Sequence, residues 1–205
     1  MPFLLSLSKR IDNISEFIGR WVAWLVLLAV LISAGNAAMR KAFNASSNGF
    51  LEIQWYLFAA VFLLASGYTL MRQEHVKIDV VSGHFSKRTQ IWIDIVGICV
   101  FLLPFTFMII KLAMPLVINA YITQEVSSNA GGLIRWPVFA LLPTGMLLLA
   151  MQAVSELIKR IAFLQGLIPD PSKKMGSKTP EQELAEFLQQ KEVAAREAAQ
   201  MGAQK

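Results

Sequence analysis

Side chains that could carry out chemistry are few in this chain of 205 residues, which has two histidines and one cysteine. His75 and Asp79 are four residues apart, so on a helix they would share a face and offer two ligands to a metal ion. A metal site needs a third ligand, and the sequence offers none at a suitable spacing. Cys99 can form no disulfide within the chain, and both histidines lie in a polar segment unsuited to binding haem inside a membrane bundle. We therefore expect no catalytic constellation, no metal and no cofactor bound by this chain.

Polar residues beside apolar stretches are the second group of candidates. Asn36 and Arg40 precede a short loop and Glu52 follows it, so these side chains can form one polar cluster at the outer surface. Asp94 lies one or two turns into a later apolar stretch, where it can pair with Arg88 or meet a helix of another subunit. The simplest interpretation of Asp94 is an interfacial carboxylate that a neighbouring cation neutralises.

Four apolar stretches must position these residues. A helix rises about 1.5 Å per residue, so a hydrocarbon core of about 30 Å requires roughly 20 apolar residues. Hydrophobic residues make up 55% of the chain and charged residues 16%, a balance that excludes an ordinary soluble domain. Backbone amides in lipid must find partners within their own segment, which favours helices. The predicted fold is an all-α membrane protein with transmembrane helices over residues 19–39, 51–71, 90–113 and 134–157.

The distribution of positive charge predicts the orientation of these spans. Lys and Arg are more frequent before the first span, between the second and third, and after the fourth than in the other two loops. The positive-inside rule therefore places both termini and the middle loop in the cytoplasm. The formal charge of +5 has the same explanation, and no basic patch interleaved with aromatic residues indicates a nucleic-acid partner.

Two segments flank the spans. Residues 1–18 show apolar side chains at helical spacing opposite polar ones, which is typical of an amphipathic helix in the inner headgroup layer. An extension of the first span is an equally good interpretation, whereas a cleaved signal peptide is disfavoured because the apolar run is too long. Residues 166–205 are expected to form a cytoplasmic linker and a short, charged, solvated helix.

Within the spans, small residues and prolines predict local packing. Ala29, Ser33 and Ala37 recur every four residues, which favours close approach of another helix. Pro104 and Pro143 interrupt the third and fourth spans and are each expected to bend a helix. We expect a compact bundle of four helices without a transport pathway of its own.

The region from Tyr68 to Asp94 carries a recognisable combination of residues. It contains Arg72, the run His75-Val76-Lys77-Ile78-Asp79, a basic turn at Lys87-Arg88, and then Asp94. This pattern resembles the small membrane subunit, of DctQ type, of tripartite ATP-independent periplasmic (TRAP) transporters. The similarity extends over roughly residues 10–160 and includes Asn36, Arg40, Glu52, Trp55, Trp136, Pro137, Pro143 and Gly145.

The resemblance implies a secondary transporter of three parts in the bacterial inner membrane. A periplasmic binding protein would capture an organic acid, and a large membrane subunit would carry it, driven by an ion gradient, commonly of sodium. The small subunit would scaffold the large one and help the binding protein to dock. Arg72, His75 and Asp79 would then fix the geometry of the cytoplasmic loop, although generic interfacial anchoring also accounts for them.

The residues alone are also compatible with two other classes of membrane protein. A four-span assembly or scaffold protein unrelated to TRAP systems would show the same spans. A small homo-oligomeric channel would show them too, but the shortage of polar residues within the spans argues against it.

Overall fold

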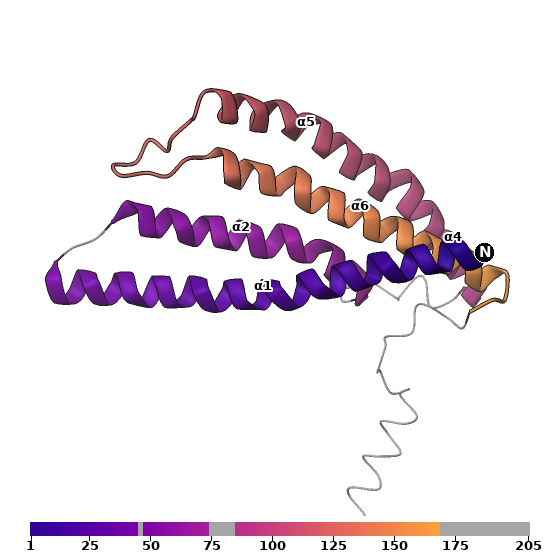
Figure 1. Ribbon diagram of the computed structural model, residues 1–205. Coiled ribbons are helices and arrows are strands. Elements are labelled where there is room, and N and C mark those ends of the chain that lie inside the picture. Colours follow the sequence, from indigo (N-terminus) through magenta and orange to yellow (C-terminus); the bar gives the residue numbers. More distant parts are fainter. Residues whose placement is uncertain (45–46, 74–84, 169–205) are drawn as a thin grey trace, which may run out of the picture. The chain divides into compact units, whose positions relative to one another are not determined.

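The computed structural model describes residues 1–44, 47–73 and 85–168 (Figure 1). Its elements are α1 (Pro2–Phe43), α2 (Asn48–Met71), α4 (Lys87–Gly97), the π-helical turn η1 (Ile98–Leu102), α5 (Leu103–Ile122) and α6 (Trp136–Leu164). Since α4, η1 and α5 follow one another without a break, the described residues contain four helices long and apolar enough to cross a membrane. This finding confirms the predicted all-α fold with four spanning helices. The cytoplasmic tail predicted at 166–205 lies outside the described residues from 169 onward.

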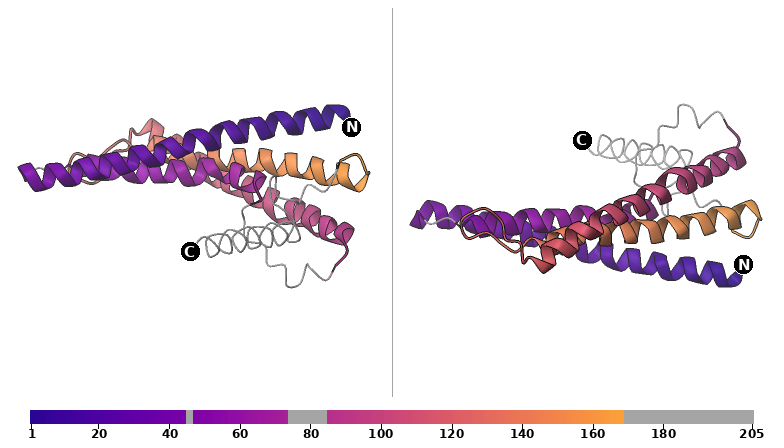
Figure 2. Two further views of the ribbon diagram at one scale, coloured as in Figure 1. Left: turned by 90° about the horizontal axis from the view of Figure 1, so that it is seen from below. Right: turned by 90° about the horizontal axis from the view of Figure 1, so that it is seen from above.

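Helix α6 is the centre of the unit Met1–Pro171. It packs against α2 and α5 along its length and also contacts α1 and α4. Figure 1 shows α1, α2, α6 and α5 following one another in a row, and Figure 2 shows α1 and α4 on opposite sides of α6 at the end that carries the N-terminus. The third span therefore joins the unit mainly through α6, so the arrangement is more open than the compact bundle that we expected.

Helix α1 runs for 42 residues without a break, from Pro2 to a C-cap at Asn44, whose φ is 52°. The segment 1–18 is thus a continuation of the first span, which was one of our two interpretations. Its buried face consists of Ser8, Ile11 and Ser15, whereas Leu4 is exposed. On its polar side Asp12 and Glu16 are half-buried because α6 and Arg72 present polar groups to them, whereas Lys9 and Asn13 are exposed.

The third span is longer than predicted, from Lys87 to Ile122. Pro104 falls in the first turn of α5, directly after the π-helical turn η1. Proline lacks an amide hydrogen and its ring clashes with the carbonyl four residues earlier, so a wider turn accommodates it. The interruption of the third span that we predicted at Pro104 therefore corresponds to the π-helical turn η1.

The strip of small residues on α1 approaches another helix at one position only. Ala29 is buried, but Ser33 and Ala37 are exposed and line a hollow between α1 and α2. Within the described residues, the facing residues of α2, which include Gln54 and Phe58, leave space beside Ser33 and Ala37, so the close approach predicted for the strip is seen at Ala29.

Candidate functional site

Glu52, in the first turns of α2, ties the loop at 123–135 to that helix. The side chain is only 2% exposed. Its carboxylate accepts hydrogen bonds from the Ser127 hydroxyl, from the Asn129 amide at 2.7 Å and from the Leu133 backbone N–H at 2.7 Å. Three donors satisfy the charge that burial would otherwise penalise.

The loop itself is folded back like a short hairpin. The Ser127 N–H donates to the Leu133 carbonyl and the Arg135 N–H to the Glu125 carbonyl, both at 2.9 Å. An ion pair of 2.9 Å between the Arg135 and Glu125 side chains closes its base. The turn passes through Gly131, whose φ of 71° suits glycine.

Two further bonds hold the loop against α2. The Asn48 amide donates to the Ala130 carbonyl at 3.2 Å, and the Tyr56 hydroxyl donates to the Ile134 carbonyl at 3.1 Å. At the start of α6, Trp136 meets Tyr121 edge to face, with ring centroids 5.5 Å apart. The loop is therefore an ordered surface held against α2.

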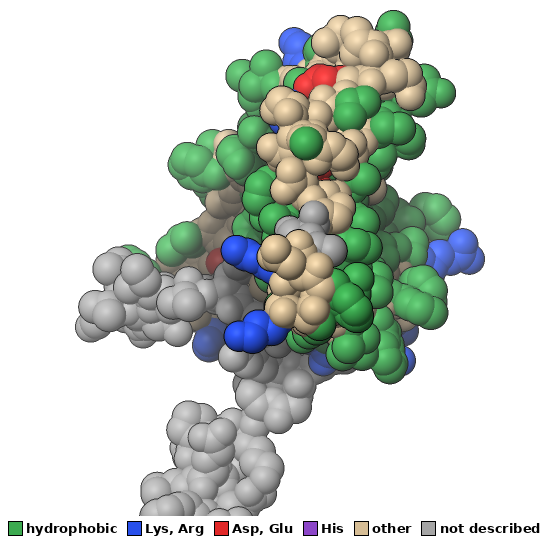
Figure 3. Space-filling view, turned by 90° about the vertical axis from the view of Figure 1, so that its left-hand side faces the viewer, with side chains coloured by type: hydrophobic (Ala, Val, Ile, Leu, Met, Phe, Trp, Pro, Cys, Tyr) green, Lys and Arg blue, Asp and Glu red, His purple; other side chains and the backbone are tan. Residues whose placement is uncertain are grey.

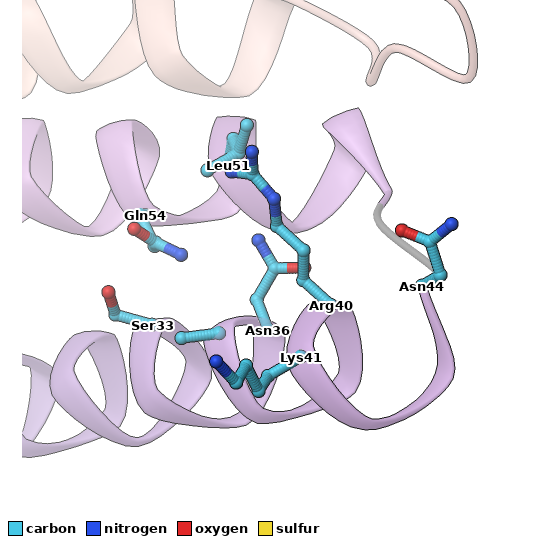
Figure 4. A pocket seen from close by; sticks show the side chains of 8 residues that line it. Ser33, Asn36, Arg40, Lys41, Asn44, Leu51 and Gln54 are labelled. Carbon is cyan, nitrogen blue, oxygen red and sulfur yellow. The ribbon is translucent and has the colours of Figure 1, made fainter.

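Asn36 and Arg40 lie elsewhere on this end of the molecule. They line a hollow of about 490 Å³ between α1 and α2, in which Arg40 extends toward Leu51 and Asn36 points into the same gap (Figure 4). The single polar cluster predicted for Asn36, Arg40 and Glu52 is thus divided in two, because the loop at 123–135 binds Glu52. Trp55, which the family resemblance also included, is exposed on α2.

At the opposite end, Arg72 joins α2 to α1. Its guanidinium donates to both oxygens of Glu16, at 2.8 and 2.9 Å, and lies 5.3 Å from the centre of the Tyr68 ring. The Tyr68 ring in turn packs on Gly19, where an added Cβ would come within 2.4 Å of it. Of the motif predicted to fix the cytoplasmic loop, only Arg72 is described, since His75 and Asp79 lie outside the described residues.

Asp94 is paired within the chain. Its carboxylate lies 3.2 Å from the guanidinium of Arg160, on α6. Arg160 is 3% exposed and also pairs with Glu156, which is 1% exposed. Our sequence interpretation named Arg88 or another subunit as the partner and missed Arg160.

The same face of α6 bonds to α1. Asp12 accepts hydrogen bonds from the Gln152 amide and the Ser155 hydroxyl, both at 2.8 Å, and pairs with Lys159 at 3.2 Å. Ser8 shares a 2.7 Å bond with Ser155. We name this set the polar seam; its members are Ser8, Asp12, Ser15, Gln73, Asp94, Gln152, Ser155, Glu156, Lys159 and Arg160.

The seam could have been found in the sequence. Gln152, Ser155, Glu156 and Lys159 stand at positions i, i+3, i+4 and i+7 at the end of the fourth span, which places them on one helix face.

Gly145 and Pro143 pack inside the unit. An added Cβ at Gly145 would come within 2.7 Å of the Leu63 carbonyl oxygen on α2. Gly67 makes the reciprocal approach, with the Leu148 carbonyl at 3.1 Å from such a Cβ. These residues therefore position two helices and offer no groups for chemistry.

The described residues bring together no group of three or more His, Cys, Asp or Glu side chains that could hold a metal ion. Cys99 is exposed on the third span. Over the part of the chain that is described, the networks around Glu52 and Glu156 lie toward opposite ends of the helices.

Comparison with known proteins gives one match. Residues 29–163, more than half of the chain, match the model of the family described as tripartite ATP-independent periplasmic transporters, DctQ component. No curated protein and no solved structure matches the chain. The match begins within α1 and ends within the last turns of α6, so it contains all four spans except the N-terminal part of α1. This chain therefore belongs to the DctQ component family of TRAP transporters, and it is a small, multi-pass membrane subunit of such a system.

Proposed function

We propose that the chain is a static frame for the large membrane subunit of its transporter and helps the periplasmic binding protein to dock, during ion-gradient-driven uptake of an organic acid. In this proposal the chain lies in the bacterial inner membrane with both termini in the cytoplasm. The sodium gradient acts on the complex, and this chain binds neither sodium nor substrate.

The observation that supports the proposal is that buried carboxylates at both ends of the helices are fixed by hydrogen bonds and ion pairs. Glu52 and Glu156 are buried and each is bonded to several donors, so neither is available to bind and release a solute. Such networks rigidify a protein when every member is satisfied. A subunit built in this way suits a fixed support better than a moving carrier.

The outer surfaces of the helices provide area for a partner. Large apolar side chains are exposed on every span, among them Trp24, Phe62, Phe107 and Leu147. Lipid can cover such surfaces as well as protein can, so the partner is expected on only part of them. The ordered loop at 123–135 offers a second, rigid surface, on which the soluble binding protein can dock.

A labelling experiment tests both orientation and docking. Single cysteines are placed at Ser128→Cys, in the loop, and at Asn13→Cys, near the other end, in a Cys99→Ser background. In intact cells freed of the outer membrane, a membrane-impermeant maleimide should label position 128 and spare position 13. In vesicles that also hold the large subunit, a bulky maleimide at 128 should reduce uptake that depends on the binding protein.

The same bulky label at position 13, attached after permeabilisation, is the matched control and should leave uptake unchanged. Labelling of position 13 from outside would contradict the orientation. Full uptake with the modified position 128 would contradict the docking role, and uptake by this chain alone would contradict the framework role.

A further inference from the structure

Two hollows lie end to end between α1 and α2. One is about 490 Å³ and the other about 360 Å³, and they share Ser33, Ala37 and Gln54 in their linings. Together they form one groove, which starts near the end of α1 and continues toward the middle of the helix pair. Figure 4 shows the residues that line the first hollow.

The mouth of the groove is cationic. Its lining includes Arg40 and Lys41, together with the amides of Asn36, Asn44 and Gln54, and it contains no carboxylate. Neither Arg40 nor Lys41 forms an ion pair with another described residue, whereas Arg72, Arg135 and Arg160 all do. In the end-on view of Figure 3, Lys and Arg side chains lie on the lower part of the face, and basic and acidic side chains lie together near its top. The mouth therefore presents uncompensated positive charge and neutral hydrogen-bond donors.

The continuation of the groove is apolar. It is lined by Ala29, Val30, Ala34 and Phe58, besides the three shared residues. The small side chains on α1 make this part of the groove wide, and Phe58 forms part of its α2 wall. Both helices are long and apolar enough to span the membrane, so the apolar part lies beside lipid chains.

A cationic mouth that leads into an apolar groove matches a molecule with an anionic head and a hydrocarbon chain. We propose that the groove binds one anionic glycerophospholipid, with its phosphate at Arg40 and Lys41 and one acyl chain along Ala34 and Phe58. Basic residues near a bilayer surface attract anionic headgroups, and burial of methylene groups adds to the affinity. A soluble anion would use the mouth and leave the apolar part empty. The proposal concerns this chain alone and stands apart from its role in transport.

The test uses the full chain in detergent, titrated with phosphatidylglycerol or with phosphatidylcholine, and native mass spectrometry counts the bound lipids. The wild-type chain should retain one phosphatidylglycerol in preference to phosphatidylcholine. The variant Arg40→Gln/Lys41→Gln should bind phosphatidylglycerol on the order of 25-fold more weakly, or about fivefold for each charge removed. Lys9→Gln/Arg10→Gln removes an adjacent exposed pair from the other end of α1 and should bind like the wild type.

A second variant tests the apolar half. Ala34→Phe fills the groove at an exposed position, so it should weaken phosphatidylglycerol binding while leaving the binding of soluble glycerol phosphate unchanged. Leu27→Phe, at an exposed position of α1 outside both hollows, is the control for an added aromatic ring. Circular dichroism and gel filtration establish that each variant is folded before its binding is compared.

Three results would overturn the proposal. The first is equal binding of phosphatidylglycerol by the wild type and the folded Arg40→Gln/Lys41→Gln variant. The second is binding of free phosphate or a dicarboxylate as tightly as the lipid, which would indicate a soluble-anion site. The third is cross-linking of position 34 to a protein and not to lipid in the purified complex, which would show that a subunit fills the groove.

Discussion

At the scale of single residues, one buried carboxylate holds a whole loop in place. Glu52 accepts three hydrogen bonds from residues 127–133, which are more than 70 positions away along the chain. Its neighbours on α2 are apolar, so the sequence alone suggested an interfacial position and an outer cluster with Arg40. The three donors come from a loop whose fold depends on Gly131 and on pairing across the hairpin, and no local pattern reveals this contact.

Removing this carboxylate should free the loop. In Glu52→Ala the Leu133 N–H loses its acceptor, so its hydrogen exchange should become on the order of tenfold faster, because bonds to a charged group are the stronger ones. Glu125→Ala, which removes only the partly exposed pair with Arg135, is the control and should change that rate much less. Equal protection of Leu133 in the wild type and in Glu52→Ala would contradict the anchoring role.

The glycines of the spans should differ sharply in their tolerance of a methyl group. Gly145→Ala would bring a Cβ within 2.7 Å of the Leu63 carbonyl, so α2 and α6 must separate, and the expected loss of stability is about 1–3 kcal/mol. Gly35 has nothing within 4 Å of such a Cβ, so Gly35→Ala should be neutral or slightly stabilising. Thermal unfolding in detergent measures both, and an unchanged midpoint for Gly145→Ala would show that the helices do not pack as closely as described.

At the scale of elements, α6 organises the unit through one polar face. Gln152 and Ser155 bond to α1, Glu156 bonds to Gln73 after α2, and Arg160 bonds to α4. Apolar side chains dominate the other faces of the helices, and lipid solvates them as well as protein does. The polar face therefore supplies the specificity that apolar packing cannot supply in a membrane.

Arg160 should be the most sensitive position of this face. Arg160→Met removes the cation that Glu156 and Asp94 share and leaves Glu156 with Lys159 as its cation. The loss of stability should therefore approach, without exceeding, the cost of about 3–5 kcal/mol for breaking a buried pair. The double variant Arg160→Met/Glu156→Met removes both buried charges, so much of the lost stability should be recovered. The measurement is a double-mutant cycle on unfolding midpoints, and strictly additive losses would argue against a coupled pair.

The elements differ in how far the sequence predicts them. The existence of four apolar helices follows from length and composition, and the spans predicted at 51–71 and 134–157 correspond to α2 and α6. The far end of the third span was misplaced because residues 114–122, which follow Lys111 and include Pro115, continue α5 to Ile122. Pairing between helices could not be predicted, since identical apolar surfaces fit many arrangements, and only the polar residues select one.

At the scale of the whole molecule, the family match and the polar seam do not coincide. The match begins at residue 29, whereas the α1 side of the seam lies between Ser8 and Ser15. The partners of these residues on α6 lie inside the match. The N-terminal part of α1 is therefore integral to the folded unit although the family model does not cover it.

Truncation at the two ends of the chain should affect stability differently. Deletion of residues 2–16 exposes the buried Gln152 and Ser155 without partners, so the folded yield and the unfolding midpoint should both fall. Deletion of residues 172–205 leaves the compact unit Met1–Pro171 whole and should leave the midpoint unchanged. Gel filtration and thermal unfolding of the two truncated chains measure these effects. Similar yields and midpoints for both would contradict the prediction that only the N-terminal deletion destabilises the unit.

The length of α1 has a consequence for the way the protein sits in its bilayer. A helix of 42 residues measures about 63 Å, roughly twice the thickness of the hydrocarbon layer. Even a tilt of about 40° would keep only about 39 Å of it inside that layer, so more than 20 Å must stand clear of the lipid chains. The exposed ring of Trp21 marks a level suited to the headgroups, and the nineteen residues from Pro2 to Arg20 would rise about 28 Å beyond it. The N-terminal part of α1, braced by α6, thus extends well past the hydrocarbon layer as a continuous helix.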